Sequence, residues 1–352
     1  MAVSAINQGL EVGRRALQAQ QAALNVTGHN IANANTPGFS RRQVNLENVR
    51  GATGVDVSSV VRQRSQFLDA QIRVEQQLLG RWESMERALG GLEAIFNEPA
   101  GAGSSEAGTI FNEPSGVGLS GSLSRFWNAW QDLANVPESG AARAALRQEA
   151  EFLSITLHQY NAQLRDARIE LDKEAVNEVA AINEILDQLA ELNGEIPQSQ
   201  FDQGNGGDLE DQRDRLLEDL SLRVDISTVQ RENGQVSVLL SGHNLVEGTK
   251  SVHLDTRQLS RDGVTSSRIF FEDDGSLAPV REGRLRGLIE VRDEVIPGIL
   301  GRLDTMVQAM VEEVNALHNA GFGRDGSTGV DFFDATMTSA SNIAVDDAIL
   351  ND

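Results

Sequence analysis

A stretch of about fifty residues without glycine or proline most strongly constrains how this chain can fold. Apolar side chains recur at spacings of three and four from Leu146 to Leu171, and after a shift near Ala175 the pattern resumes as far as Leu189. This spacing is typical of a helix that packs along its whole length. At 1.5 Å per residue the stretch would form a helix roughly 75 Å long. The sequence therefore predicts a long structural rod.

Three further stretches show the same helical spacing, and two stretches do not. The helical stretches are 68–96, 119–133 and 296–317. Gly204–Gly207 should end the long helix, and Asp208 should cap a shorter one. Residues 44–64 alternate loosely as a hairpin would, and Asn233-Gly234 between two alternating runs predicts another hairpin, with further strands near His253 and at 269–271. The fold class expected is α+β and mainly α, with long coiled-coil-like helices in a discontinuous helical bundle and an inserted β-rich domain.

The domain boundaries expected from these patterns divide the chain into five segments. The segments are an N-terminal assembly helix and turn at 1–40, a long-helix rod domain at 41–223 with a Gly/Ser loop at 100–118, a β-rich domain at 224–282, a helix returning to the rod at 283–320, and the start of a further, incomplete segment at 321–352. The motif Ile-Phe-Asn-Glu-Pro occurs twice, at 95–99 and 110–114, which indicates a local duplication beside the loop.

The first helix has the most regular apolar pattern. A large apolar residue recurs at every seventh position of a helix expected from about residue 4 to 32, and Ala5, Val12, Ala19 and Val26 flank this series. The series that we expect to form an assembly interface is Val3, Leu10, Leu17, Leu24 and Ile31. A stripe of this kind has to be covered. Because no partner for this helix is evident within the chain, we expect the helix to be partly disordered in the monomer and to order on assembly.

A turn should follow this helix directly. Asparagine tolerates left-handed conformations, Pro37 cannot continue an α-helix, and Pro-Gly is a strong turn signal. The residues expected to fix this turn into the next domain are Asn30, Asn33, Asn35, Thr36, Pro37, Gly38 and Phe39.

Charge and composition exclude several functions. The net charge of -22 argues against nucleic acid as the main partner, although residues 1–64 hold seven arginines and only three acidic residues. No stretch of about 18 apolar residues would span a membrane, and no signal-peptide pattern begins the chain. There is no cysteine, the five histidines lack metal-binding spacing, and no glycine-rich stretch has a phosphate-loop pattern. We therefore expect no enzyme activity, no catalytic residue, no cofactor and no metal.

The segment 30–41, Asn-Ile-Ala-Asn-Ala-Asn-Thr-Pro-Gly-Phe-Ser-Arg, resembles the amino-terminal motif that rod, hook and hook-associated proteins of the bacterial flagellum share. Further blocks narrow the resemblance to the FlgK family of hook-associated protein 1, the hook-filament junction proteins. These blocks are 110–114 leading into 127–139, Asp211-Gln212-Arg213-Asp214 with Leu216-Leu217, 283–293, and Asn315-Ala316-Leu317-His318. The family's carboxy-terminal helix, which pairs with the amino-terminal helix, has no counterpart here, so the chain looks like a truncated member.

The resemblance implies a structural subunit of the flagellum. Such a subunit would be exported through the flagellar type III pathway without a cleavable signal peptide. It would then form a homo-oligomeric ring outside the cell, with the hook protein on one side and the second junction protein on the other, and without membrane insertion. Two other readings stay open. One is another axial protein of the rod or hook, and the other is a cytoplasmic coiled-coil scaffold. The stripe could also belong to an ordinary helix within a domain.

Overall fold

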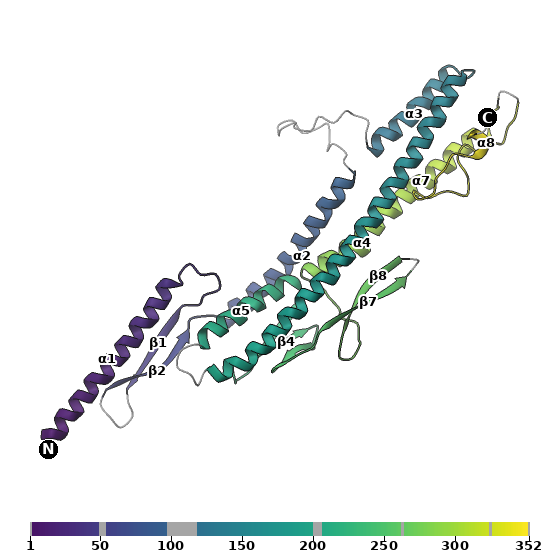
Figure 1. Ribbon diagram of the computed structural model, residues 1–352. Helices are drawn as coiled ribbons and strands as arrows, with labels where there is room; N and C mark the ends of the chain where they lie inside the picture. Colours follow the sequence, from purple (N-terminus) through teal and green to yellow (C-terminus); the bar gives the residue numbers. More distant parts are fainter. Residues whose placement is uncertain are drawn as a thin grey trace, which may run out of the picture. The chain divides into compact units, whose positions relative to one another are not determined.

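The structure is a computed structural model that describes residues 2–48, 54–96, 118–199, 206–261, 264–323 and 326–350. The chain forms two compact units, and Figure 1 labels most of their helices and strands. Unit 1 comprises Met1–Trp82 and Val176–Arg286, and unit 2 comprises Glu83–Ala175 and Gly287–Asp352. Long helices with small antiparallel sheets confirm the expected fold class. The division into five segments stays a prediction, and the loop at 100–117 lies outside the described residues.

The predicted helices are present, and most are longer than expected. The helices are α1 (Ala2–Ala32), α2 (Gln66–Phe96), α3 (Leu119–Asn135), α4 (Gly140–Ser199), α5 (Gly206–Arg223), α6 (Arg284–Glu290), a π-helical turn η1 (Val291–Val295), α7 (Ile296–Asn319) and α8 (Asp347–Leu350). None of these described helices is long and apolar enough to cross a membrane.

Helix α5 begins earlier than the sequence predicted. Gly206 and Gly207 are already helical, so Asp208 lies in the first turn and is not the cap. The carboxylate of Asp208 instead pairs with the guanidinium of Arg42. Because a cap must direct its side chain back to the helix's own amide groups, this ion pair explains why the expected capping role was wrong.

Helix α4 continues through Pro197, as its expected end at Gly204–Gly207 requires. A proline inside a helix normally leaves the carbonyl four residues earlier without a donor. Here that carbonyl belongs to Asn193, and the side-chain amide of Gln235 donates to it over 3.0 Å. The substitute hydrogen bond offsets part of the cost of Pro197, so the helix reaches sixty residues.

In its described residues, unit 1 has three antiparallel sheets. Strands β1 (Arg42–Asn48) and β2 (Val55–Arg62) form the expected hairpin, with a bulge at Asn45/Leu46. A second sheet has the order β3 (Ile226–Gln230), β4 (Val236–Leu240), β5 (His243–Glu247) and β6 (Lys250–Ser251), and β7 (Leu254–Arg261) pairs with β8 (Val264–Phe271). Gly234 has a φ of 83° in the turn between β3 and β4. The Asn-Gly hairpin is therefore confirmed.

Asparagine side chains on the helices attach non-helical segments of the chain. An amide side chain has one donor and one acceptor side, so it can pair with a backbone as a neighbouring strand does. The side chain of Asn193, for example, donates to the carbonyl of Val236 over 2.8 Å and accepts from its N–H over 3.0 Å. The same pairing joins Asn30 to Arg42, Asn183 to Leu254, and Asn315 to Phe333.

The core of unit 2 includes part of the segment that was expected to begin a new, incomplete domain. Phe332 and Phe333 are almost fully buried and lie against Phe126 of α3, with ring centroids 6.1 Å and 5.8 Å away. Asn315 of α7 holds the backbone of both phenylalanines. This segment therefore packs within unit 2.

A buried ion pair also lies in unit 2. Arg292, in the π-helical turn η1, is 1% exposed and pairs with Asp172 of α4 at 2.5 Å and with Asp293 at 2.9 Å. Burial of a lone guanidinium would be costly, but two carboxylates compensate its charge. Burial tends to lower the pKa of Arg292, and the neighbouring carboxylates, Asp293 foremost, outweigh burial and raise that pKa above its ordinary value.

Candidate assembly surface

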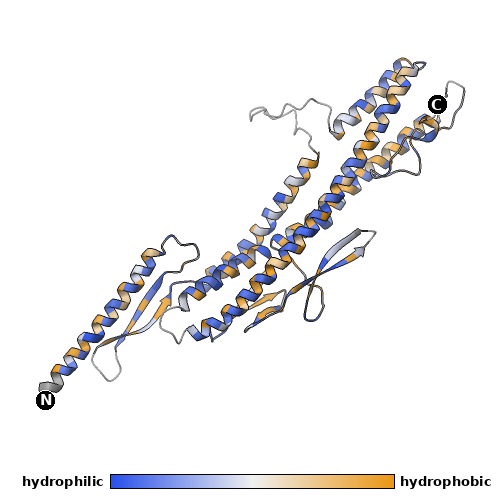
Figure 2. Ribbon diagram, viewed as in Figure 1, coloured by the Kyte–Doolittle hydropathy of each residue, from blue (hydrophilic) through white to orange (hydrophobic). Residues whose placement is uncertain are grey.

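The predicted stripe of helix α1 is open to solvent. Four of its side chains are largely exposed: Leu10 by 68%, Leu17 by 72%, Leu24 by 71% and Ile31 by 73%. Figure 2 shows the recurring apolar bands along α1. The side chain of Val3 lies outside the described residues. Ile6, 63% exposed, lies four residues before Leu10 and extends the same face, a position that sequence reasoning missed because it follows the helical turn and not the heptad.

The other side of α1 packs against the β1–β2 hairpin. Ala19 is 2% exposed, and Val12 and Val26 are half-buried. Gly54, which precedes β2, lies so close that a Cβ there would be 3.8 Å from the Cα of Val12. The expectation that α1 has no partner within the chain is therefore wrong. The hairpin covers the side that bears Val12, Ala19 and Val26, and it leaves the stripe uncovered.

The predicted turn residues take different parts in ending α1. The Asn33 side chain donates to the His29 carbonyl over 3.1 Å and accepts from the Thr36 hydroxyl over 3.2 Å. The Thr36 N–H donates to the Asn33 carbonyl over 2.9 Å. Asn30 instead reaches across the turn to the backbone of Arg42. Asn35, Thr36 and Pro37 are exposed.

Gly38 is the turn residue with the strictest requirement. Its φ of 77° lies in the left-handed region that disfavours side chains. A Cβ at this position would also overlap the side chain of Arg215 on α5. Beside Gly38, the guanidinium of Arg42 lies over the ring of Phe39, with the Cζ atom of Arg42 5.5 Å from the ring centroid. The turn thus fits closely against α5.

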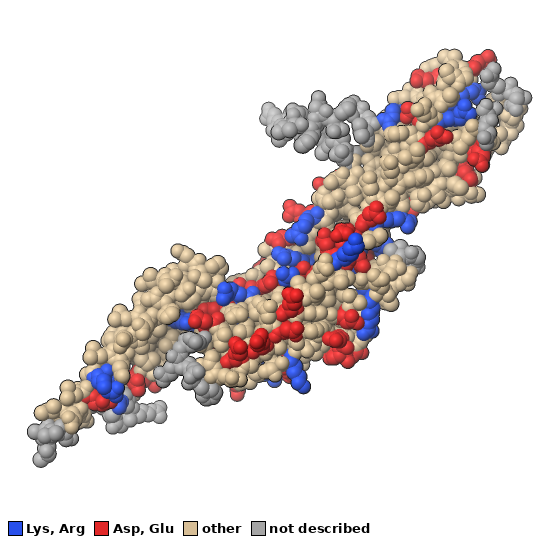
Figure 3. All heavy atoms as spheres, viewed as in Figure 1, with Lys and Arg blue, Asp and Glu red and all other residues tan. Residues whose placement is uncertain are grey.

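An arginine cluster joins the β1–β2 hairpin to α5. The cluster, which we define as Arg42, Arg62 and Arg64, pairs with six carboxylates, and Figure 3 shows basic and acidic side chains side by side on this unit. Arg62 lies at its centre, with Nη2 2.6 Å from both Asp211 and Asp214 and Nη1 3.1 Å from Glu210. Arg42 contacts Asp208 and Asp211, and Arg64 contacts Asp69, Asp214 and Glu218.

The arginine cluster is largely buried, so its charges have to compensate each other. The side chain of Arg62 is 12% exposed, and that of Asp211 is 5% exposed. Burial alone would lower the pKa of Arg62, but the carboxylates of Asp214 and Asp211 outweigh burial and raise that pKa above its ordinary value. Arg62 therefore stays charged, and breaking its pairs would leave carboxylates without compensation in a partly dry site.

Sequence reasoning missed the arginine cluster, although both halves carried a signal. The excess of arginine in residues 1–64 was visible in the sequence. Asp211–Asp214 was noted only as one of the blocks that resemble the FlgK family. Their pairing spans about 150 positions, which no local pattern reveals. Only the structure brings Arg62 and Asp211 together.

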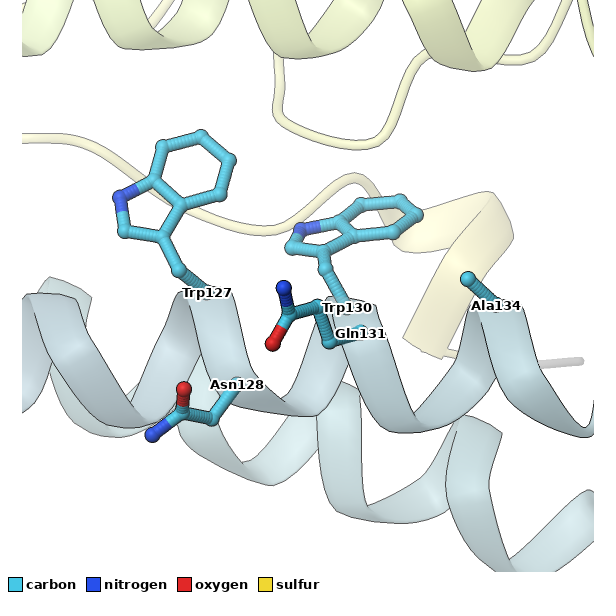
Figure 4. Close-up of a pocket in the computed structure, with 5 residues that line it drawn as sticks. All are labelled: Trp127, Asn128, Trp130, Gln131 and Ala134. Carbon is cyan, nitrogen blue, oxygen red and sulfur yellow. The ribbon is translucent and has the colours of Figure 1, made fainter.

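Other exposed apolar side chains occur on α2 and α3. Helix α2 exposes Phe67 by 77% and Trp82 by 59%. On α3, a shallow hollow of about 370 Å³ is lined by Trp127, Asn128, Trp130, Gln131 and Ala134, and Figure 4 shows both indole rings on the same side of the helix. One helix supplies all five side chains, so the hollow is an open depression of the surface.

The fold and this surface define a class of protein, namely helical structural subunits that present an exposed apolar helix. Residues 104–333 match the family described as the flagellar hook-associated protein FlgK helical domain, and residues 10–39 match the flagella basal body rod protein family. The chain belongs to the FlgK family of flagellar hook-associated proteins. That family consists of structural proteins of the flagellum and not of enzymes.

Two relatives of this chain are both named flagellar hook-associated protein 1. Flagellar hook-associated protein 1 of Bacillus subtilis is 28% identical over 97% of this chain and 74% of its own length. The Salmonella typhimurium protein of that name is 29% identical over 90% of this chain and 57% of its own length. A solved structure, the flagellar hook junction protein FlgK from Burkholderia pseudomallei, shares the fold with a TM-score of 0.61 at 22% identity, over 75% of this chain and 46% of that one.

Proposed function

We propose that this chain is a structural subunit of the junction between flagellar hook and filament and that it self-assembles through the stripe of α1. The observation that carries the proposal is the uniform exposure of Leu10, Leu17, Leu24 and Ile31 on one face of a helix whose other side is covered. The family and the names of its relatives support the flagellar setting. The matched B. subtilis and S. typhimurium relatives extend beyond the part that this chain spans.

The size of the stripe favours assembly among several neighbours. Full burial of one leucine-sized side chain contributes about 1.5 to 3 kcal/mol, so four side chains that are each about 70% exposed would contribute roughly 4 to 8 kcal/mol. Association costs on the order of 4 to 15 kcal/mol in lost freedom of motion. One stripe against one partner would therefore fall short of that cost over most of this range. A closed ring, in which each subunit contacts two neighbours, removes the shortfall because every subunit then buries more surface.

The remaining features of the proposal follow from the family. Subunits would leave the cell through the flagellar export pathway, and the ring would have the hook protein on one side and the second junction protein on the other. The turn at Asn33–Phe39 and the arginine cluster would fix the direction in which α1 leaves the rest of unit 1. A rod or hook protein is the second candidate, and the match of residues 10–39 to the rod family favours it only for this shared segment.

The test replaces one residue of the stripe in the chromosomal gene. Leu17→Asp puts a charge on the exposed face of α1, so we expect cells without attached filaments, counted by electron microscopy. Asn25→Asp adds the same charge at an exposed position off the stripe and is the matched control. Normal filaments with Leu17→Asp, or equal losses with both variants, would rule out the role of the stripe. Circular dichroism of the purified variants shows whether the β strands still fold.

A further inference from the structure

A histidine and two aspartates in the β region bring metal-ligand atoms together. His243 begins β5, and Asp273 and Asp274 follow β8. The Nε2 atom of His243 lies 3.1 Å from both carboxylate oxygens of Asp273, and its Nδ1 atom lies 4.0 Å from an oxygen of Asp274. We propose that these three residues bind a divalent transition-metal ion, best fitted by Zn²⁺, which joins β5 to the turn after β8.

The spacing of the ligand atoms fits one ion. Imidazole nitrogen and carboxylate oxygen bind Zn²⁺ at about 2.0 to 2.2 Å, so two ligands of one ion lie at most about 4.4 Å apart. In this group, one ligand atom from each residue can be chosen so that all three lie within 4.8 Å of one another. Small side-chain rotations would therefore close the site, and water would complete the coordination.

The ligands are held in place before any ion binds. The ring of His243 stacks on that of Phe271, with centroids 3.9 Å apart and planes inclined by 15°. Asp274 accepts a hydrogen bond from the N–H of Ser276 over 2.7 Å. Two carboxylates and a neutral imidazole suit a dication, and the nitrogen ligand favours zinc over calcium, which prefers six to eight oxygens.

A neighbouring histidine provides an internal comparison. His253 has Asp187 2.8 Å from Nε2 and Glu272 3.6 Å from Nδ1, so it has the same kinds of neighbour. Among the residues that the structure describes, however, only the His243 group brings three such atoms within 4.8 Å of one another. This site was not predicted from the sequence, because His243 lies thirty positions from Asp273 and does not follow any metal-binding spacing.

Isothermal titration of the full 352-residue chain with ZnCl₂ tests the proposal. We expect one saturable site and a rise in the melting temperature of the chain, because the ion would link the four-stranded sheet to the β7–β8 pair. His243→Ala and Asp274→Asn should each weaken binding by about tenfold or more, as loss of a ligand or its support does elsewhere. His253→Ala is the matched control and should leave the affinity unchanged.

Three outcomes would overturn the proposal. They are no saturable zinc binding by the unaltered chain, an equal loss of affinity with His253→Ala, and displacement of zinc by an equal concentration of calcium. Asp274→Asn removes a ligand charge at a half-exposed turn and keeps the shape of the side chain, so it tests the site even if His243→Ala disturbs the stacking on Phe271.

Discussion

Replacement of Arg62 by alanine should release the β1–β2 hairpin from α5 while the rest of unit 1 stays folded. Arg62 is the only member of the arginine cluster that contacts Glu210, Asp211 and Asp214 together in the described part of the chain. It also donates to the hydroxyl of Ser40 over 3.2 Å. One substitution therefore removes ties to α5 and to the turn after α1 at once.

The expected size of the effect follows from burial. Removal of one partner from a buried ion pair costs about 3 to 5 kcal/mol, because the other charge stays in a poorly solvated site. Here Asp211 keeps Arg42 at 3.5 Å, and Asp214 keeps Arg64 at 3.4 Å. These remaining contacts place the cost near the lower end, at about 3 kcal/mol. Since each 1.4 kcal/mol is a factor of ten, the hairpin should open roughly a hundred times more often.

Native-state hydrogen exchange followed by mass spectrometry measures this opening directly. Peptides that cover β1 and β2 should exchange about a hundredfold faster in Arg62→Ala, with little change in α4. Arg231→Ala is the matched control. Arg231 also pairs with a carboxylate, Glu247, at 2.6 Å, but its side chain is 48% exposed, so its loss should cost about 0 to 1 kcal/mol. Equal, small changes in both variants would refute the argument from burial.

Three further predictions concern the turn, unit 2 and the stability of α1 at low pH. Gly38→Ala should destabilise the turn by at least about 1 to 2 kcal/mol in urea unfolding, because φ is 77° there; no change would contradict the strain. Asn315→Ala should lower stability by about 1 to 3 kcal/mol, because the amides of Phe332 and Phe333 lose their acceptor, and an unchanged calorimetric melting temperature would disprove this role. Hydrogen bonds from Arg14 and Arg15 lower the pKa of Glu11 from 4.5 to about 2. The stabilisation from ionised Glu11 is thus complete above pH 4.5 and is lost as the pH falls toward 2. Circular dichroism should therefore show a loss of helix over that range that Glu11→Gln abolishes, and an identical acid transition in both proteins would contradict it.

Local patterns predicted much of the fold. Heptad spacing located α1, the Asn-Gly pair located the β3–β4 turn, and the change to alternating residues located the β region. These features depend on neighbours in sequence, so one chain suffices to find them. The apolar stripe of α1 was also predicted, because large apolar side chains at heptad spacing can only lie on one face of a helix.

Long-range contacts could not be predicted from the same patterns. The hydrogen bond by which Gln235 supplies the donor missing at Pro197 joins α4 to a distant segment. The packing of Phe332 on Phe126 joins segments about two hundred positions apart. Even the start of α5 depended on whether Asp208 would cap its helix or pair with Arg42. In each case two local preferences were possible, and a distant residue decided between them.

The uneven charge of the sequence has its explanation within unit 1. An arginine-rich start in an acidic chain can indicate an anionic partner. Five of the six described arginines in residues 1–64 instead pair with carboxylates of this chain. Arg14 and Arg15 pair with Glu11 along α1, and the arginine cluster pairs with α2 and α5. The excess positive charge thus serves mainly to dock the hairpin, and apolar contact is left as the chief means by which the exposed face of α1 can bind a neighbour.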